Sequence, residues 1–268
     1  MKRLILLIVL VLLAGIAGIV ARSSSRAEIK EMVSQSTGDA RQVIRENFEL
    51  APGAQVELTG LNGAVKIETS DSKTAEVHIE RTASSDKDLE RRPITIQATS
   101  NSLRIRSEKN KSGFLSRFFS SDASEKVTLK LPRQISLYTK GVNGPVTVGE
   151  VDGSVEVAGV NGRVEIASAT GAASFKGVNG SVVLGLKTIS SAGVTLAGVN
   201  GNIELQLPAD ANADLETKGV NGRVTSDLPN VTIDKSRHGN YTARIGNGGN
   251  SISAKGINGN ILLSHRKA

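Results

Sequence analysis

Apolar and polar residues alternate along most of residues 132–264, in short runs on either side of a repeated corner sequence. Every second position is Val, Ile, Leu, Ala or Phe, apart from Thr139, Thr217 and Ser226, and the positions between are mostly polar. A period of two is typical of a β-strand with one buried face. The pattern therefore predicts two half-buried strands in each repeat. Five apolar residues fall in the outward-facing set: Tyr138, Ala158, Val183, Ala197 and Leu262.

The corner sequence is G-[VI]-N-G. Its Asn residues are Asn143, Asn161, Asn179, Asn200, Asn221 and Asn258. Successive Asn residues are 18, 18, 21, 21 and 37 positions apart, and a fixed period of about 20 residues indicates stacked units. The last gap is about two periods long. We expect the sequence IGNGGN at Ile245–Asn250 to replace one corner there.

Two all-β folds satisfy this pattern. A single-chain β-solenoid (β-helix) of 18–21-residue coils would enclose the apolar set and stack the Asn residues at one corner. Their side chains would then form a hydrogen-bonded ladder with a spacing of about 4.8 Å. The alternative is an antiparallel meander of hairpins closed into a sandwich or barrel, because N-G favours tight hairpin turns. The solenoid explains why the corner is repeated so literally, which a hairpin does not require.

Residues 43–131 show strand patterns that are less regular. The run LNGAVKIE contains a diverged corner at Asn62, with Val65 and Ile67 predicted to face inward. We expect this part to continue or cap the stack, because an open end would expose unpaired strand edges. The β domain is thus predicted to span residues 43–264, followed by a basic tail at 265–268.

The chain opens with a segment typical of export. Two basic residues, Lys2 and Arg3, precede 18 uncharged and mostly apolar residues, Leu4–Ala21. A helix of that length spans about 27 Å, close to the ~30 Å of a bilayer core. It is longer than the apolar part of a secretory signal, about 7–15 residues.

Small residues near its end, among them Ala17 and Ala21, nevertheless permit cleavage. We therefore predict a signal-anchor or signal peptide at residues 1–21 and a polar juxtamembrane spacer at 22–42. Either form would place the rest of the chain outside the cytoplasm. The expected location is the bacterial cell envelope, either anchored by a single transmembrane helix or secreted or periplasmic after cleavage.

Composition narrows the chemistry. The absence of Cys excludes disulfides and Cys-based metal or redox sites. With 5 Phe, 2 Tyr and no Trp, a core of large aromatic side chains is not expected. A net charge of +7 mildly favours anionic partners.

The runs LNGAVKIE, AEVHIE and VTLKLPRQISLYTKGVNGPVTV, the tandem G-V-N-G-x-V corners and the ending IGNGGNSISAKGINGNILL carry a family resemblance. Over residues 43–264 the chain resembles the bacterial β-strand-repeat family of "putative adhesins", a domain of unknown function related to the head GIN domain. The resemblance implies an exported, membrane-linked β-solenoid without established catalytic residues.

The residues beside the corners form the first candidate site. In stacked coils, Lys140, Lys176, Lys218 and Lys255 would lie along one edge, with Ala158 and Ala197 on the intervening coils. Arg163 and Arg223, just after their corners, would widen the edge. We hypothesise a strip that binds an acidic polymer or phospholipid headgroups. Ordinary solubility and protection of strand edges by Lys are the simpler explanation.

The second candidate is the run KNKSGFLSRFFSSD, which holds Phe114, Phe118 and Phe119 among basic residues. If exposed, this loop would contact a membrane surface or a partner. If buried, it would plug the end of the core, and this is the interpretation that we prefer.

Catalytic chemistry finds little support. His78, His238 and His265 are widely separated, and no cluster has the spacing of metal ligands, so neither a triad, a metal site nor a cofactor is predicted. Nucleic-acid binding is not expected either, because aromatic residues do not interleave with a basic patch. The best catalytic candidate is the run 226–240, which we expect to be a solvated loop; its functional groups are Asp227, Asp234, Lys235, Arg237 and His238.

The sequence therefore predicts a non-catalytic, exported envelope protein. Its β-solenoid would bind or adhere to envelope polymers, lipid or protein partners, with residues 4–21 in the membrane. The alternatives are an envelope polysaccharide-processing enzyme acting from residues 226–240 and a self-assembling scaffold.

Overall fold

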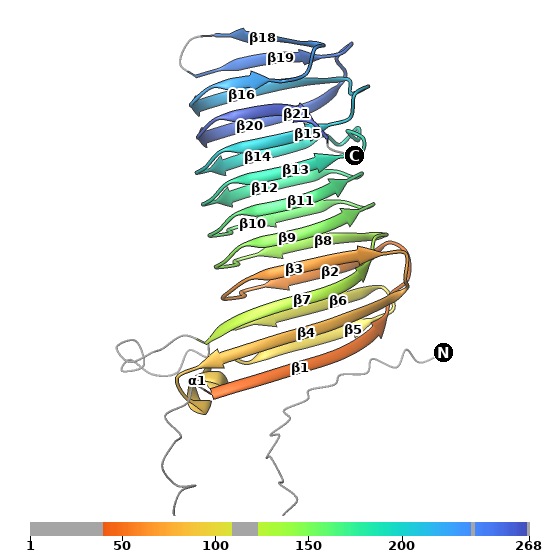
Figure 1. Ribbon diagram of the computed structural model, residues 1–268, viewed down its shortest axis with the longest axis vertical. Helices are drawn as coiled ribbons and strands as arrows, with labels where there is room; N and C mark the ends of the chain where they lie inside the picture. Colours follow the sequence, from red (N-terminus) through yellow and green to blue (C-terminus); the bar gives the residue numbers. More distant parts are fainter. Residues whose placement is uncertain (1–39, 109–122, 237–238, 267–268) are drawn as a thin grey trace, which may run out of the picture.

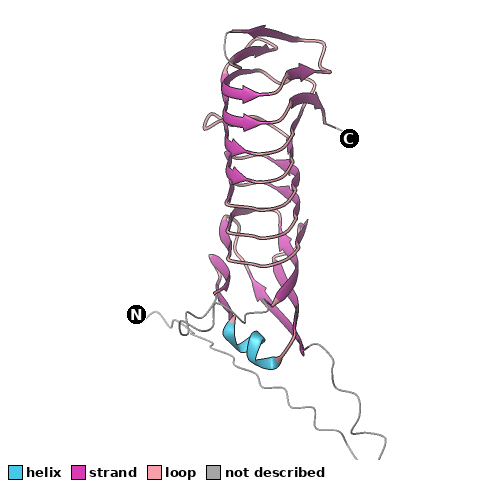
Figure 2. Cartoon of the chain, turned by 90° about the vertical axis from the view of Figure 1, so that its left-hand side faces the viewer, coloured by secondary structure: helices cyan, strands magenta, loops and turns pink. Residues whose placement is uncertain are grey.

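A computed structural model describes residues 40–108, 123–236 and 239–266. They form an elongated all-β molecule in which two large mixed sheets face each other without closing (Figure 1). Turned by 90°, the sheets are two columns of strands joined by short loops (Figure 2). One short helix, α1 (Asp86–Arg91), lies at the lower end.

Sheet A contains ten strands. In spatial order these are β1 (Ala40–Glu49), β4 (Thr74–Ala83), β7 (Ser124–Pro132), β3 (Val65–Ser70), β9 (Val146–Val151), β11 (Val164–Ala169), β13 (Val182–Leu186), β15 (Ile203–Leu207), β21 (Ile261–His265) and β17 (Val224–Ser226). Strand β1 already begins at Ala40, ahead of the predicted domain start at residue 43.

Sheet B contains eleven strands. From the upper end downward they are β18 (Val231–Lys235), β19 (Tyr241–Ile245), β16 (Ala213–Asn221), β20 (Asn250–Asn258), β14 (Val194–Val199), β12 (Ala173–Val178), β10 (Val155–Ala158), β8 (Ile135–Lys140), β2 (Ala54–Thr59), β6 (Ser102–Ser107) and β5 (Ile94–Thr99).

Each corner joins a strand of sheet B to a strand of sheet A. We call this strand–corner–strand unit a rung and name it by its Asn. From residue 135 to 207 successive rungs pair in parallel, with one register shift between Ile166 and Ala169 of β11. Val157 thus lies beside Thr139 on one side and Phe175 on the other. Antiparallel pairing across a corner, which would join Val157 to Ile166, is therefore wrong for this region.

The core lies between the two sheets. Every position of the predicted inward set is buried except Ser226, which is half-buried. The apolar residue inside each corner, such as Val142, Val160 or Val178, is buried as well, at 1% exposure. The corners thus extend the apolar core between the sheets.

The two glycines of each corner are required for different reasons. The first is left-handed, as in Gly177 with φ of 63°, a conformation that costs other residues about 1–2 kcal/mol. The second has no room for a side chain, because a Cβ on Gly180 would lie 2.3 Å from the carbonyl oxygen of Gly162 on the next rung.

The corner Asn side chains form one continuous ladder. Each Nδ2 donates to the Oδ1 of the rung below, at 2.8–3.0 Å, in the order Asn221, Asn258, Asn200, Asn179, Asn161, Asn143 and Asn62. Asn258 therefore lies between Asn200 and Asn221, and the rungs do not follow sequence order. The C-terminal strands β20 and β21 fill a space that the chain leaves open when it passes from β15 to β16.

The sequence at Ile245–Asn250 does not replace a corner, contrary to the prediction. It connects β19 to β20 by passing the start of β16, where the backbone N–H of Asn247 donates to Asn212 Oδ1 at 2.7 Å. The run 226–240 is likewise not a simple solvated loop. It contains β18, which pairs antiparallel with β19 at the upper edge of sheet B.

At the lower end, too, a rung lies between strands that are not its neighbours in the sequence. Strands β2 and β3 form the rung of Asn62, which lies between β6 and β7 below and β8 and β9 above. The antiparallel strands β4 and β1 extend sheet A, and β5 extends sheet B. Residues 40–108 and 123–132 thus both continue and terminate the stack.

Candidate functional site

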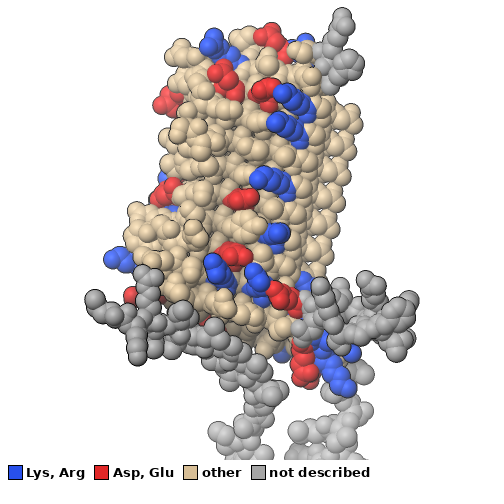
Figure 3. Space-filling view, turned by 180° about the vertical axis from the view of Figure 1, so that it is seen from behind, with Lys and Arg blue, Asp and Glu red and all other residues tan. Residues whose placement is uncertain are grey.

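Sheet B brings the predicted corner lysines into one row. Its register sets Lys140, Ala158, Lys176, Ala197, Lys255 and Lys218 side by side, in that order. We call the four lysines, all exposed, the lysine row. Lys255 and Lys218 are direct neighbours, with no Ala rung between them. In the space-filling view of one long face, basic side chains lie along the long axis with acidic ones beside several of them (Figure 3).

Two members of the lysine row have acidic neighbours. Lys176 Nζ lies 3.6 Å from Glu156 Oε1, and Lys218 Nζ lies 3.0 Å from Glu216 Oε1. Lys140 and Lys255 form no ion pair with any described residue. Exposed pairs of this kind contribute about 0–1 kcal/mol, so they leave the ammonium groups accessible to a stronger anionic ligand.

The two arginines that were expected to widen this edge lie across the corner, on sheet A. Arg163 immediately precedes β11, where its Nε is 3.2 Å from Glu165 Oε2. Arg223 precedes β17 near the upper end, and its backbone N–H donates to Asn260 Oδ1 at 3.0 Å. Three rungs separate the two arginines, so they do not form one patch.

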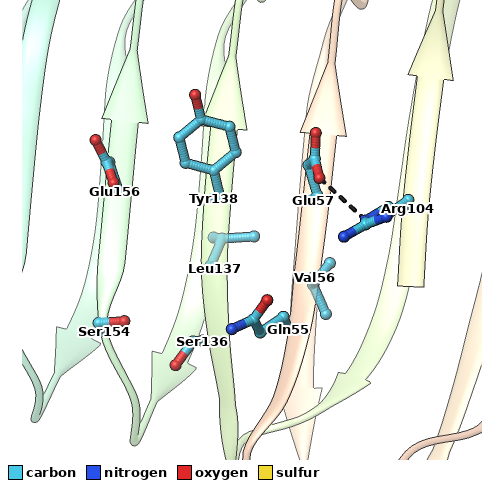
Figure 4. Close-up of a pocket in the computed structure, with 9 residues that line it drawn as sticks. All are labelled: Gln55, Val56, Glu57, Arg104, Ser136, Leu137, Tyr138, Ser154 and Glu156. Carbon is cyan, nitrogen blue, oxygen red and sulfur yellow. Dashed lines mark ion pairs between the residues drawn. The ribbon is translucent and has the colours of Figure 1, made fainter. Parts of the chain in front are cut away.

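A hollow of about 260 Å³ lies on the outer face of sheet B, near the lower end of the lysine row. Tyr138 of β8 stands at its centre, with Glu57 of β2 and Glu156 of β10 on either side in the same row (Figure 4). Uncharged polar side chains form the neighbouring row: Gln55, Ser136 and Ser154. Arg104 Nε on β6 is 3.3 Å from Glu57 Oε2.

A buried charged cluster terminates the Asn ladder at the lower end. Glu125 of β7 is 2% exposed and accepts hydrogen bonds from the backbone N–H of Asn62 at 2.8 Å and from Ser107 Oγ at 2.6 Å. Arg92 Nε lies 3.3 Å from its Oε1. Arg81 is also buried, and burial lowers the pKa of its guanidinium, an effect that nearby Glu125 opposes. These contacts are structural, because they close the lowest corner.

Of the candidate catalytic residues that the structure describes, Asp227 lies apart from Asp234 and Lys235 in the fold. Asp227 follows β17 of sheet A, whereas Asp234 lies on β18 of sheet B, and both are exposed. Lys235 Nζ is 5.6 Å from the centre of the Tyr241 ring. Arg237 and His238 lie outside the described residues. Within residues 40–108, 123–236 and 239–266, no three acidic or His side chains are arranged as metal ligands.

Two further predictions fall outside the described residues. They are the membrane segment at residues 4–21 and the loop with Phe114, Phe118 and Phe119. Among the residues that are described, no helix has the length and apolar character needed to cross a membrane.

Sequence reasoning missed Glu125 and the hollow around Tyr138. Tyr138 carried a signal, because it is the one aromatic residue in the outward-facing set. Glu125 gave no such signal, since its role depends on β6 and β7 pairing below the rung of Asn62, a position that chain order does not indicate.

Comparison with known proteins gives structural neighbours only. No protein-family model matches the chain, and no curated protein matches it in sequence. A "putative cell adhesion protein" from Clostridium sporogenes ATCC 15579 is 15% identical, with a TM-score of 0.36; the match covers 84% of this chain and 100% of that one.

Two other solved structures give similar matches. A "putative adhesin" from Parabacteroides merdae ATCC 43184 is 12% identical over 83% of this chain and 96% of that one, with a TM-score of 0.28. A "putative lipid binding protein" from Parabacteroides distasonis ATCC 8503 is 10% identical over 84% and 97%, with a TM-score of 0.25. At these TM-scores the likeness supports no conclusion about what this chain binds.

Proposed function

We propose that this protein is a non-catalytic binding module of the bacterial cell envelope, and that its long face on sheet B binds an anionic polymer. The observation that carries the proposal is the lysine row, in which four exposed ammonium groups project from strands held in register. A linear polyanion matches such an array, because both present charge along one axis.

We further propose that residues 135–236 and 239–266 form a two-sheeted β-solenoid. The support is that each rung passes once through each sheet and pairs in parallel with its neighbours. The Asn ladder and the buried corner residues then fix the spacing of the rungs at about 4.8 Å. Because the strands that carry the lysines are already rigid, the polymer binds without the entropic cost of ordering that backbone.

The proposed location is outside the cytoplasm, either held by residues 4–21 in the membrane or released after cleavage. The basis is the sequence itself, with Lys2 and Arg3 ahead of an apolar run of 18 residues. An envelope location agrees with the export that the family resemblance of residues 43–264 implies. It would place the lysine row among acidic polymers.

The test is co-sedimentation or gel retardation of the full chain with polygalacturonate, a linear polyanion, at low and high salt. The variant replaces all four residues of the lysine row by Ala. The matched control replaces four exposed lysines of the lower, sheet A side by Ala, which changes the net charge equally: Lys66, Lys73, Lys126 and Lys130.

We expect salt-sensitive binding that falls by at least about tenfold in the variant and much less in the control. Equal losses in the two proteins would mean that net charge, and not the lysine row, attracts the polymer. No binding by the wild type would refute the proposed ligand.

A further inference from the structure

We propose that the hollow around Tyr138 is a subsite for a neutral sugar ring of a polysaccharide lying along sheet B. The site is separate from the lysine row in its chemistry, because its central group is an aromatic ring and its ligand carries no charge. Small-ligand sites combine such an apolar surface with a few polar groups that fix orientation.

The aromatic ring is the first element of the argument. Among the described residues, Phe175 and Tyr241 are buried and Phe48 is half-buried against the core. Tyr138 is also half-buried, but it points outward from the middle of a polar face (Figure 4). One face of a pyranose ring consists of C–H groups that carry slight positive charge. That face stacks favourably on the negative face of an aromatic ring.

The second element is the set of polar groups around the ring. Glu57 and Glu156 flank Tyr138 on the adjacent strands, so carboxylate oxygens that accept hydrogen bonds lie on both sides of it (Figure 4). Gln55, Ser136 and Ser154 supply amide and hydroxyl groups in the next row. This combination suits a ligand rich in hydroxyl groups.

The charges around the hollow select against an acidic ring. An anionic sugar would face both carboxylates, and each of these is already paired with a basic residue: Glu57 with Arg104 at 3.3 Å, and Glu156 with Lys176 at 3.6 Å. A neutral ring leaves both ion pairs intact. It can donate hydroxyl hydrogen bonds to the carboxylates without displacing the basic side chains.

The third element is the continuation of the row above the hollow. Beyond Glu156, the same outward row presents Ser174, Thr195 and Ser253 on successive strands. Hydroxyl groups therefore recur about every 4.8 Å along the stack. The following sugar units of a polymer with one ring on Tyr138 would lie over these small hydroxyl side chains.

The test is co-sedimentation of the full chain with three uncharged, insoluble polysaccharides: cellulose, chitin and mannan. The protein is kept in a polyoxyethylene detergent, which contains no sugar. The variants are Tyr138→Ala, Tyr138→Phe and the double variant Glu57→Gln/Glu156→Gln. Thr147→Ala, on the exposed face of β9 in the same rung, is the control.

We expect binding to at least one of the three polysaccharides, with little dependence on salt. Tyr138→Ala should weaken it by about tenfold, whereas Tyr138→Phe keeps the ring and should stay within about twofold of the wild type. The double variant should also bind more weakly, and Thr147→Ala should be unchanged. Because Tyr138 is outside the core, far-UV circular dichroism of each variant should match the wild type.

Absence of wild-type binding to all three polysaccharides would overturn the inference, as would equal binding by Tyr138→Ala. Neither result bears on the lysine row. The polyanion test uses a different ligand, a different set of variants and a strong dependence on salt, so the two proposals fail separately.

Discussion

The middle of the stack and its two ends are built from the same kind of rung, but the order of the rungs along the chain differs between them. From Asn143 to Asn200 each rung lies directly above the one that precedes it in the chain. At the upper end the last rung, that of Asn258, is inserted below that of Asn221. At the lower end the rung of Asn62 is enclosed by strands that come later in the sequence. The corner motif therefore specifies the geometry of a rung but not its place in the stack.

Insertion changes which strands are left at the edges. Short strands, β17 and β18, form the upper edges of the two sheets, and the antiparallel strands β1 and β5 form the lower edges. A continued parallel stack would leave a full rung open to pairing with another chain. The difference shows that the ends are built to terminate the repeat.

The two regions also differ in how corners are stabilised. In the middle, exposed Asn side chains bond to one another, whereas the lowest corner is closed by the buried Glu125 with Asn62, Ser107 and Arg92. Breaking a buried charged cluster costs more than breaking an exposed amide hydrogen bond. Loss of the corner's hydrogen-bonding side chain should consequently cost more at the lower end than in the middle.

Glu125→Ala is expected to have the largest effect. It leaves Arg92 without its buried partner and should lower the free energy of unfolding by about 3–5 kcal/mol. Asn161→Ala, in the middle of the ladder, should lower it by about 1 kcal/mol. Urea unfolding followed by circular dichroism measures both. Similar losses in the two variants would contradict the distinction between end and middle.

Within the middle, the two glycines of one corner should differ. Gly180→Ala forces a Cβ against the Gly162 carbonyl, and we expect a loss of about 3 kcal/mol. Gly177→Ala meets its nearest atom at 3.8 Å, so only the left-handed backbone opposes it, at about 1–2 kcal/mol. The same urea titrations decide the order. A larger loss for Gly177→Ala would show that backbone conformation, and not close stacking, limits the corner.

The smallest effect concerns Glu150 of β9, which connects the middle to the inserted rung. It accepts hydrogen bonds from Lys187 at 2.8 Å and from Arg266, just after β21, at 3.0 Å. The Lys187 hydrogen bond, with Arg266 and Arg133 nearby, lowers the pKa of the Glu150 carboxyl. Its stabilisation is therefore present above the ordinary pKa of Glu and is lost as pH falls through the lowered value.

Glu150→Gln should accordingly reduce the free energy of unfolding at neutral pH by less than about 1 kcal/mol, because the group is partly exposed. The difference from the wild type should disappear on acidification. Urea midpoints of both proteins, measured from neutral pH down to below the lowered pKa of Glu150, test the sign of this pH dependence. A difference that grows toward low pH would contradict the assigned contacts.

Sequence reasoning succeeded where neighbouring residues determine the structure. Alternation identified the inward positions, and the repeated Asn and Gly indicated a common corner, because both depend on local geometry. It failed for the position of Asn258 and for Ile245–Asn250, since a step of 37 residues is compatible with several orders of rungs. It also missed Glu125 and the hollow at Tyr138, whose partners Asn62, Glu57 and Glu156 are distant in sequence.

Disulfide cross-linking tests the order of the rungs most directly. Because the chain has no Cys, only the two introduced Cys residues of a variant can form a disulfide within it. Thr195 pairs with Ser253, and Ser253 pairs in turn with Glu216. A Thr195→Cys/Ser253→Cys variant should form an internal disulfide on mild oxidation, because adjacent strands are about 4.8 Å apart. Thr195→Cys/Glu216→Cys should not, because its residues are two strands apart, about 10 Å. The opposite result would mean that the rungs follow the sequence and that the last rung is not inserted.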